Sequence, residues 1–318
     1  MRFYSVIIPI YNRPNEIDEL LESLTHQTYT NFEVIVIEDG STDTCDQIAA
    51  KYSDQLTIHY HFKENSGQGF SRNVGFEMAK GDYYLVFDSD CLIPRHYFQA
   101  VEDFLNTNSV DAFGGPDRAN KNFTTTQKAI SYSMTSFFTT GGIRGNKNHY
   151  GTFHPRSFNM GISKEVYQQL GGYIITRMGE DLEFSIRIIN AGFKTALIPD
   201  AYVYHKRRTS LSQFYKQLHF FGRARINLGR FFPKEVKLFH WFPALFTLGF
   251  LSIPFWFILK VYLGLTVVGV YVLFFLLNFL SSLLLNKSLS VAFLSIATSF
   301  TQLFAYGIGF MTEKWFSK

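Results

Sequence analysis

Cysteine is scarce in this sequence, which has only Cys45 and Cys91 among 318 residues. Two cysteines do not make a disulfide framework, and a chain kept in a reducing cytosol is consistent with that number. The N-terminal stretch MRFYSVIIPIYNRP contains an apolar run that is too short for a signal peptide, with a proline at position 9. We therefore expect the charged part of the chain to face the cytosol.

Acidic residues are missing between positions 241 and 311, where two lysines are the only charged side chains. Three apolar runs lie in this part, each close to the length of about 20 residues that crosses a bilayer. They cover about residues 242–259, 262–285 and 289–311. Pro243 and Pro254 interrupt the first run. We predict two or three transmembrane helices over 241–312, and the mean hydropathy of +0.01 averages them with a soluble part.

Basic residues crowd into the stretch just before these runs, where Glu235 is the only acid. They are Lys206, Arg207, Arg208, Lys216, Arg223, Arg225, Arg230, Lys234 and Lys237. Such an excess marks the cytoplasmic side and attracts anionic lipid, although a merely solvated basic face is the alternative. Because aromatic residues are mixed in, we predict a helical segment at 209–240 that lies on the membrane. The net charge of +4 is modest, and no nucleic-acid partner is expected.

Strand and helix patterns alternate through the first 100 residues. Short apolar runs predict four strands, over 4–10, 32–39, 56–62 and 83–88. Between the first two, Ile17, Leu20 and Leu24 recur at helical spacing. This alternation favours a parallel sheet covered by helices on both faces, with ligands at the carboxyl ends of the strands. Asp39 and Asp88 lie at two such ends.

Nucleotide-binding motifs of the two common kinds are absent from the loop NSGQGFSRNVG at 65–75. It lacks the Gly-Lys-Ser/Thr ending of a Walker loop and the three-glycine spacing of a dinucleotide fingerprint. Its glycines permit close backbone approach, and Arg72 is suited to bidentate contacts with phosphate oxygens. An ordinary loop is the alternative.

The stretch YYLVFDSDC at 83–91 ends in two acids, Asp88 and Asp90. In an extended chain, residues two apart point to the same side, and nothing nearby in the sequence neutralises these two. They suit a hard divalent cation that also binds substrate phosphates, Mg²⁺ or Mn²⁺, and no Cys and His cluster near them favours zinc. A polar strand end followed by a turn is the alternative.

The stretch MGEDLEF at 178–184 places Glu180 and Asp181 in the first turn of a predicted helix, where the helix dipole favours an anion. An ionised carboxylate beside a substrate is suited to act as a general base. Helix capping by the two acids is the alternative.

Six blocks in this order resemble glycosyltransferase family 2: SVIIPIYNRP, VIVIEDGSTD, GQGFSRNVG, VFDSD, NMGISKEVYQQLGGY and GEDLEFSIRIINAGF. The resemblance covers about residues 4–208. It implies an inverting transferase with a nucleotide-sugar donor and the α/β GT-A fold, a Rossmann-like, mostly parallel sheet flanked by helices. We therefore expect a GT-A catalytic domain at 1–208, followed by the interfacial segment and a C-terminal membrane-associated α-helical region.

The resemblance also implies roles for individual residues. Asp39 would bind uracil, Pro9 and Tyr11 would line the base and ribose pocket, and Arg72 would approach the nucleotide or its diphosphate. Asp88 would contact the ribose or the metal, Asp90 would ligate the metal, and Asp181 would be the catalytic base. His205 would be a metal ligand or diphosphate contact, with a structural role as the alternative. Glu180 is a further candidate, and His154 and Arg156 would face the acceptor or belong to the surface.

The predicted reaction is transfer of one sugar from a nucleotide-diphosphate sugar, with UDP favoured. The acceptor would be a hydroxyl of a lipid-linked or cell-surface glycan at the cytoplasmic face of the inner membrane. Polymerising members of the family carry a Q-x-x-R-W motif after the base, whereas QFYKQLHFFGRAR has no tryptophan in that place. Two alternatives are transfer onto polyprenyl phosphate itself and a non-catalytic scaffold that binds nucleotide sugars.

Overall fold

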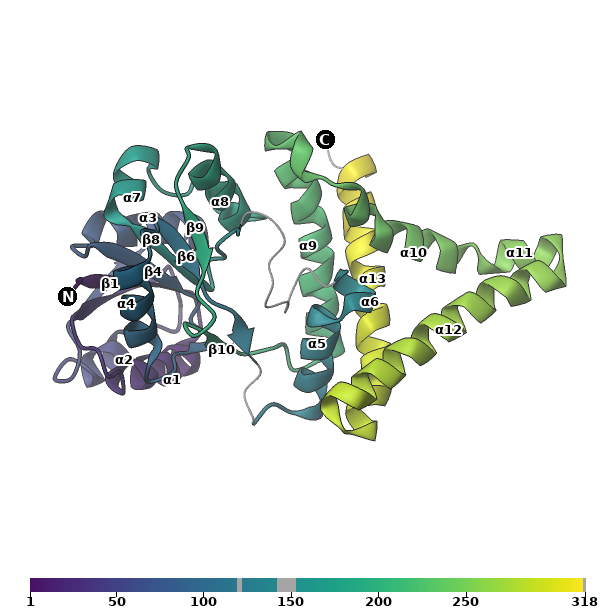
Figure 1. The fold of residues 1–318 in the computed structure, drawn as a ribbon, viewed down its shortest axis with the longest axis horizontal. Coiled ribbons are helices and arrows are strands. Elements are labelled where there is room, and N and C mark those ends of the chain that lie inside the picture. The colour runs from purple at the N-terminus through teal and green to yellow at the C-terminus, as the bar shows by residue number, and fades with distance from the viewer. Residues whose placement is uncertain (119–121, 142–152, 317–318) are drawn as a thin grey trace. The chain divides into compact units, whose positions relative to one another are not determined.

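The computed structural model of the chain describes residues 1–118, 122–141 and 153–316 (Figure 1). They fall into two compact units. The first comprises Met1–Asn120 and Lys147–Lys206, and the second comprises Lys121–Asn146 and Arg207–Lys318. Each unit is described by itself below.

A mixed, mostly parallel sheet of seven strands forms the centre of the first unit, in the order β3-β2-β1-β4-β8-β6-β9. The strands are β1 (Tyr4–Ile10), β2 (Phe32–Asp39), β3 (Ile58–Lys63), β4 (Tyr83–Phe87), β6 (Ala112–Gly114), β8 (Asn159–Ser163) and β9 (Thr195–Leu197). The first four are parallel to one another, as predicted. The antiparallel β8 lies between β4 and β6 and was not foreseen.

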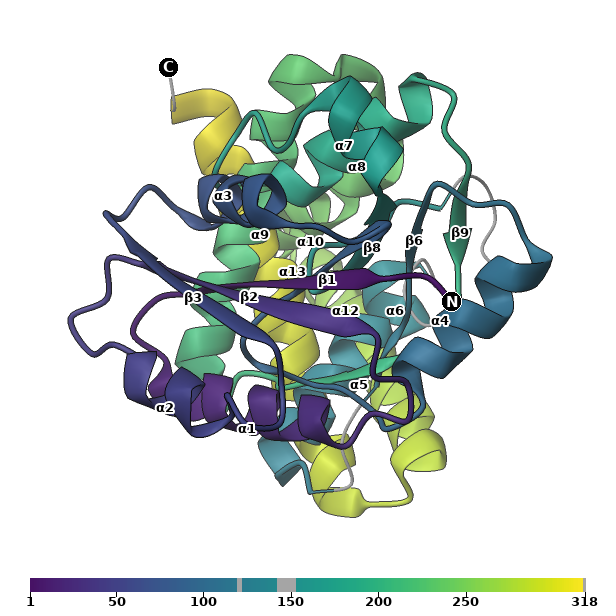
Figure 2. The same ribbon diagram turned by 90° about the vertical axis from the view of Figure 1, so that its left-hand side faces the viewer.

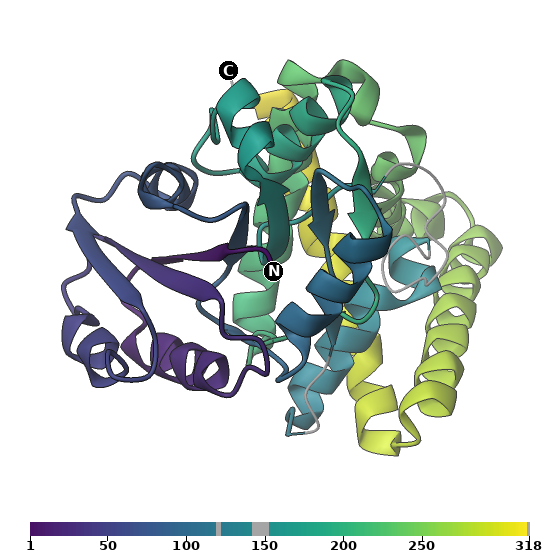
Figure 3. The same cartoon turned by 60° about the vertical axis from the view of Figure 1, so that its left-hand side comes forward.

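Helices cover both faces of this sheet (Figures 2 and 3). They are α1 (Pro14–Thr25), α2 (Asp46–Lys51), α3 (Gln68–Met78), α4 (Tyr97–Thr107), α7 (Lys164–Leu170) and α8 (Glu180–Asn190). Residues of α1 and α4 share one buried cluster with Val6 and Ile8, and residues of α3, α7 and α8 share the other with Ile7. The side chains of adjacent strand residues thus pack into opposite cores, because successive side chains of a strand alternate between the two faces of the sheet.

A small second sheet lies at the edge of this unit, in the order β5-β10-β7. Its strands are β5 (Cys91–Leu92), β7 (Asp117–Arg118) and β10 (Val203–His205). The strand β10 is antiparallel to β5, with His205 opposite Cys91. This pairing brings a residue from the end of the unit beside the DSD stretch.

Helix α8 buries a different set of residues from the one its sequence suggests. The pattern indicates a stripe of Leu182, Ile186 and Ile189. In the structure Phe184 and Ile188 are buried against the sheet together with Ile186, whereas Leu182 and Ile189 are half-buried. Phe184 and Ile188 stand one turn apart and so share a face, which is the face that the sheet covers.

Within its described residues, the second unit consists of helices and their connections. The helices are α5 (Thr125–Thr135), α6 (Phe137–Thr140), α9 (Leu211–Phe231), α10 (Phe242–Leu251), α11 (Ile253–Leu259), α12 (Val261–Asn286) and α13 (Leu289–Phe316), with two short 3₁₀ turns at Pro233–Glu235 and Leu238–Trp241. Two of them, α12 and α13, are long and apolar enough to cross a membrane. A third span results if Leu238–Leu251 and Ile253–Leu259, which are bent by 45°, count as one. Pro254 explains the bend, because its ring cannot continue the helix of α10.

The helix α5 packs against the C-terminal helices. Thr298 of α13 donates to the carbonyl of Ala129 at 3.1 Å, and the Tyr132 hydroxyl donates to the carbonyl of Asn278 in α12 at 3.0 Å. This helix begins with a capping box of Thr124 and Gln127. A segment from the middle of the chain thus belongs to the same unit as the apolar helices.

Helices α9 and α13 lie side by side at close range (Figure 1). Gly222 and Gly309 permit this, because an added Cβ at Gly222 would lie 2.2 Å from the Tyr306 carbonyl oxygen. The carboxylate of Glu313 joins the two helices further, with Arg223 at 2.9 Å and Arg230 at 3.1 Å. The predicted contact of α9 with a membrane surface stays a prediction.

The substitution Gly309→Ala is expected to destabilise the second unit by about 1–3 kcal/mol, because the new Cβ would lie 2.0 Å from the His219 carbonyl oxygen. Thermal unfolding in detergent, followed by the helical circular dichroism signal, measures the effect. The matched control is Gly269→Ala in α12, where a Cβ meets nothing within 4 Å. Equal unfolding midpoints for the two variants would contradict the close packing of α9 on α13.

Candidate active site

The carboxylate of Asp39 at the end of β2 holds the loop that precedes α3. Its Oδ1 accepts hydrogen bonds from Lys63 Nζ at 2.5 Å and from the Ser66 amide at 2.9 Å, and its Oδ2 accepts from the Gly67 amide at 2.9 Å. Burial would raise the pKa of Asp39, but Lys63 and these donors outweigh burial and lower it. The sequence analysis missed Lys63, although its place at the end of the adjacent parallel strand is a usable signal. The uracil-binding role of Asp39 stays a prediction.

Pro9 and Tyr11 lie at and just beyond the carboxyl end of β1. Pro9 is half-buried within the strand, and the side chain of Tyr11 is 51% exposed. The next residue, Asn12, adopts a left-handed conformation with φ of 51°. Its side-chain oxygen accepts from the amides of Thr42 and Asp43 at 2.9 and 3.1 Å. The turn after β1 and the loop after β2 are thereby joined, as a pocket for a base and ribose requires, and the two predicted contacts stay predictions.

Asp88 and Asp90 do not lie on an extended strand. The strand β4 ends at Phe87, and both acids belong to the turn before β5. The expectation that they point to one side as strand residues do is therefore wrong. No neutralising group lies near them in the sequence, but the fold brings such groups from distant positions. Three cationic or imidazole groups lie within ion-pair distance of the two acids: Arg72 Nη2 at 2.8 Å from Asp88 Oδ1, Arg13 Nη1 at 3.5 Å from Asp90 Oδ2, and His205 Nε2 at 3.0 Å from Asp90 Oδ1.

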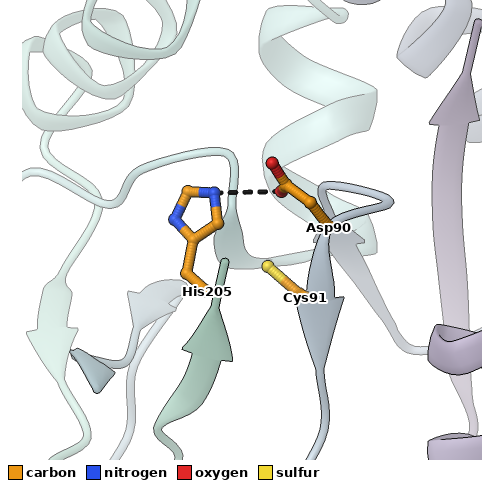
Figure 4. Close-up of side chains that lie close together, drawn as sticks. All are labelled: Asp90, Cys91 and His205. Carbon is orange, nitrogen blue, oxygen red and sulfur yellow. Dashed lines mark ion pairs between the residues drawn. The ribbon is translucent and has the colours of Figure 1, made fainter. Parts of the chain in front are cut away.

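Asp90, Cys91 and His205 form a candidate metal centre, with one ligand atom from each lying within 4.8 Å of the others (Figure 4). A carboxylate oxygen and an imidazole nitrogen fit Mn²⁺ or Mg²⁺. Cys91 does not fit a hard ion, because burial raises the pKa of its thiol and the thiol donates to the Phe158 carbonyl at 3.5 Å. The residues of this group that fit such an ion are therefore Asp90 and His205, and the predicted ligand roles of these two and of Asp88 stay predictions.

Arg72 is buried inside the first unit, with 2% of its side chain exposed. Its guanidinium joins two acids from different elements, Asp88 at 2.8 Å and Glu180 at 3.3 Å. Its positive charge also lies over the Tyr173 ring, 5.4 Å from the centroid. Its expected approach to a diphosphate stays a prediction, because in the structure these contacts occupy the guanidinium. In the structure, Arg72 links the turn that contains Asp88 to Glu180 at the start of α8.

Glu180 and Asp181 begin the helix α8, as predicted. One oxygen of Asp181 accepts from Arg156 Nε at 2.6 Å, and the other accepts from the Leu182 amide at 2.8 Å. The side chain of Gln68 donates to Glu180. The two neighbouring acids therefore have different side-chain partners. Asp181 has the guanidinium of Arg156, whereas Glu180 has the amide of Gln68 and shares the guanidinium of Arg72 with Asp88.

These partners push the pKa values of the two acids apart. Burial would raise the pKa of Asp181, but the charges of Arg156 and Arg72 outweigh burial and lower it. Burial and the charge of Asp181 raise the pKa of Glu180 against the opposing effect of Arg72. The lowered pKa of Asp181 favours its ionised form, which is the form a general base needs.

Arg156 and His154 follow the part of the loop that lies outside the described residues. Arg156 was expected to face an acceptor or the solvent, but in the structure it pairs with Asp181. His154 is half-buried, and its predicted acceptor role stays a prediction. The chain positions from 142 to 152 are outside the described residues.

Comparison with known proteins identifies relatives along the first unit. Residues 5–171 match the model of the family described as "Glycosyl transferase family 2". An uncharacterized glycosyltransferase of Haemophilus influenzae is 32% identical over 217 residues, covering 65% of this chain and 70% of that protein. Glycosyltransferase AglE of Haloferax volcanii is 27% identical over 214 residues, covering 65% and 67%. An uncharacterized glycosyltransferase of Rickettsia felis is 38% identical over 105 residues, which are 33% of this chain but only 17% of that protein.

Two solved structures share the fold. The mannosyltransferase PcManGT from Pyrobaculum calidifontis, in complex with GDP-Man and Mn²⁺, has a TM-score of 0.63 and 16% identity, covering 100% of this chain and 88% of that one. TarS 1-349 of S. aureus, in complex with UDP-GlcNAc, has a TM-score of 0.51 and 23% identity, covering 71% and 67%. At these identities the likeness concerns the fold, and the α/β architecture predicted from the sequence is confirmed.

Proposed function

The chain belongs to glycosyltransferase family 2, and from this we propose that it is an inverting enzyme that transfers one sugar from a nucleoside-diphosphate sugar, with UDP favoured. The acceptor in this proposal is a hydroxyl of a lipid-linked or cell-surface glycan, presented at the cytoplasmic face of the inner membrane. The observation that carries the proposal is the ionised Asp181 at the start of α8, in the same unit as the pair of Asp90 and His205.

The site residues have separate roles in a single displacement reaction. Asp181 accepts the proton of the acceptor hydroxyl while the oxygen attacks the anomeric carbon from the face opposite the diphosphate. One such displacement inverts the anomeric configuration, and no enzyme nucleophile is needed. Arg156 keeps Asp181 ionised, and Arg72 holds Asp88 and Glu180 in place. Asp90 and His205 would hold a divalent ion, which supplies positive charge for the departing diphosphate.

The membrane part of the proposal rests on α12 and α13, each of which is long and apolar enough to cross a bilayer. Large apolar side chains of α12 are exposed along its length, among them Val261, Leu265, Val272, Leu276 and Leu280. Such a surface is stable only where lipid or another apolar partner covers it. An enzyme held in this way meets acceptors that carry a polyprenyl chain. Polyprenyl phosphate itself is the second acceptor that these helices would serve.

The test is donor turnover by the purified protein in nanodiscs. UDP-sugars and GDP-sugars are offered with Mn²⁺ or Mg²⁺, together with a polyprenyl-diphosphate saccharide or polyprenyl phosphate, and nucleoside diphosphate release is followed. We expect metal-dependent release from one donor that is lost in Asp90→Asn and kept in the control Asp54→Asn, which changes an exposed acid. The acceptor that stimulates release separates the two lipid-linked alternatives. Donor binding without release under every combination would support the non-catalytic scaffold instead.

The substitution Arg156→Gln is expected to shift the acidic limb of the pH–rate profile to higher pH. The guanidinium of Arg156 is the nearest cation to Asp181, and its charge opposes the effect of burial. Without it, the pKa of Asp181 rises from its lowered value. The carboxylate then takes up a proton at a higher pH, and activity is lost earlier as the pH falls. The pH dependence of kcat/KM measures this, with Arg95→Gln as a control at an exposed arginine. An unshifted acidic limb with lower activity at every pH would show that Arg156 does not act through the ionisation of Asp181.

A further inference from the structure

Arg13 lies against the candidate metal centre, although no sequence motif pointed to it. Its Nη1 is 3.5 Å from Asp90 Oδ2 and donates a hydrogen bond of 2.9 Å to Glu16 Oε2. The other oxygen of Asp90 is the one 3.0 Å from His205 Nε2. Both oxygens of this carboxylate thus have a nitrogen group near them, and one of those groups is a permanent cation.

The backbone that carries Arg13 is held in place, whereas its side chain is partly exposed. Asn12 adopts its left-handed conformation with its amide donating to Ser41 Oγ at 2.7 Å and its side chain accepting from the amide of Thr42. Pro14 follows and disfavours a helical backbone at Arg13, whose φ of −141° and ψ of 51° are neither helical nor extended. The side chain of Arg13 is nevertheless 40% exposed, in contrast with the 2% of Arg72. Arg13 is therefore the cation of this site whose side chain has room to exchange one charged partner for another.

A divalent ion on Asp90 and the guanidinium of Arg13 exclude each other electrostatically. Both need the negative charge of the same carboxylate, and two cations that share it repel. A diphosphate changes this balance, because its oxygens offer a guanidinium a bidentate partner at least as good as a carboxylate. Arg13 then gives up Asp90 without losing its charge partner.

We propose that Arg13 is a resident counter-cation of the Asp90 site, which competes with the divalent ion and leaves the site for the donor's diphosphate. The inference rests on the proposed function, and it names the residue that couples metal binding to donor binding. Because such coupling is reciprocal, the diphosphate tightens metal binding by the same factor by which the metal tightens diphosphate binding. A cation built into the site would also keep Asp90 neutralised between turnovers.

The experiment measures Mn²⁺ affinity by electron paramagnetic resonance of the free ion, on the full-length protein in detergent, alone and with UDP or GDP. In the wild type, we expect weak Mn²⁺ binding that one of the diphosphates tightens about tenfold or more. In Arg13→Gln, we expect Mn²⁺ alone to bind about 5- to 10-fold more tightly, and most of the tightening by the diphosphate to disappear. Arg13→Lys keeps the charge without the planar fork and is expected to lie between the two.

Two further variants separate the outcomes. Arg2→Gln removes an equally charged side chain that precedes β1 and pairs with Glu102, and it should bind Mn²⁺ as the wild type does. Asp90→Asn should remove the binding altogether. Mn²⁺ binding that depends on Asp90 but is unchanged or weaker in Arg13→Gln overturns this inference and leaves the proposed function standing. Failure of every variant to bind Mn²⁺, with either diphosphate, overturns the inference together with metal-dependent transfer.

Discussion

Replacing Asp181 with asparagine is expected to lower kcat by about 10²- to 10⁴-fold, the range that a positioned general base contributes. The amide has nearly the same shape as the carboxylate, but its single oxygen can accept from Arg156 Nε or from the Leu182 amide, whereas the two oxygens of Asp181 accept from both. The asparagine side chain has no affinity for a proton, however, and the acceptor hydroxyl then attacks without losing its proton to the enzyme. The affinity for the nucleoside diphosphate should change little. Turnover of the donor and acceptor pair identified by the nanodisc assay, with diphosphate binding measured in parallel, tests both expectations.

The control for this variant is Glu165→Gln, which changes an exposed acid in the first turn of another helix, α7. It alters the interaction with a helix dipole in the same way but is expected to leave kcat at the wild-type level. If Asp181→Asn kept kcat within tenfold of the wild type, another group would have to serve as the base. A loss of diphosphate affinity equal to the loss of kcat would instead assign Asp181 to binding.

The second large effect is on stability, and it concerns Arg72. Arg72→Met is expected to lower the free energy of unfolding of the first unit by about 3 kcal/mol, because Glu180 would remain buried without its cation. The value is at the low end of the range for broken buried pairs, since the side chain of Asp88 is 34% exposed and regains contact with water. For a domain of this size it corresponds to a fall of roughly 6–12 °C in the unfolding midpoint. Thermal unfolding of the full-length protein in detergent measures it.

Two comparisons make this prediction specific to the buried charges. Arg177→Met removes an exposed arginine just before α8, which hydrogen-bonds only to Asn65 among the described contacts, and should change the midpoint little. The double variant Arg72→Met with Glu180→Gln should recover part of the loss, because it removes the uncompensated charge as well. A double variant no more stable than Arg72→Met alone would mean that the packing of the arginine, and not its charge, stabilises the unit.

The alternation of strands and helices could be predicted because it depends on the local spacing of apolar residues. The apolar runs at 4–10 and 32–39 are buried strands, and the stripe of Ile17, Leu20 and Leu24 is a buried helix face. Asp39 stands at a strand end as predicted. The antiparallel insertion of β8 between β4 and β6 was not predictable in the same way, because a five-residue strand carries no mark of the neighbour with which it will pair.

The ion pairs of the site could not be read from the sequence, because each joins residues far apart in the chain. Nothing near Asp181 in sequence indicates that Arg156 is its partner, and nothing near Asp90 indicates Arg13 or His205. Arg72 was singled out for phosphate contacts because its loop is rich in glycine, whereas the fold turns it inward to bridge Asp88 and Glu180. Residue type and strand-end position were sufficient to nominate the acids but not their partners.

The sequence by itself determined the α/β alternation, the apolar C-terminal helices and the candidate acids, because these follow from local composition and spacing, and its ordered motifs carried the resemblance to the family. Only the tertiary structure decided the direction in which the pKa of each acid shifts and which cation lies beside which carboxylate. The physical reason is that a pKa depends on burial and on charges a few ångströms away, and both are set by how the chain folds. The difference between Glu180 and Asp181, adjacent in sequence and opposite in the direction of their pKa shifts, is the clearest case.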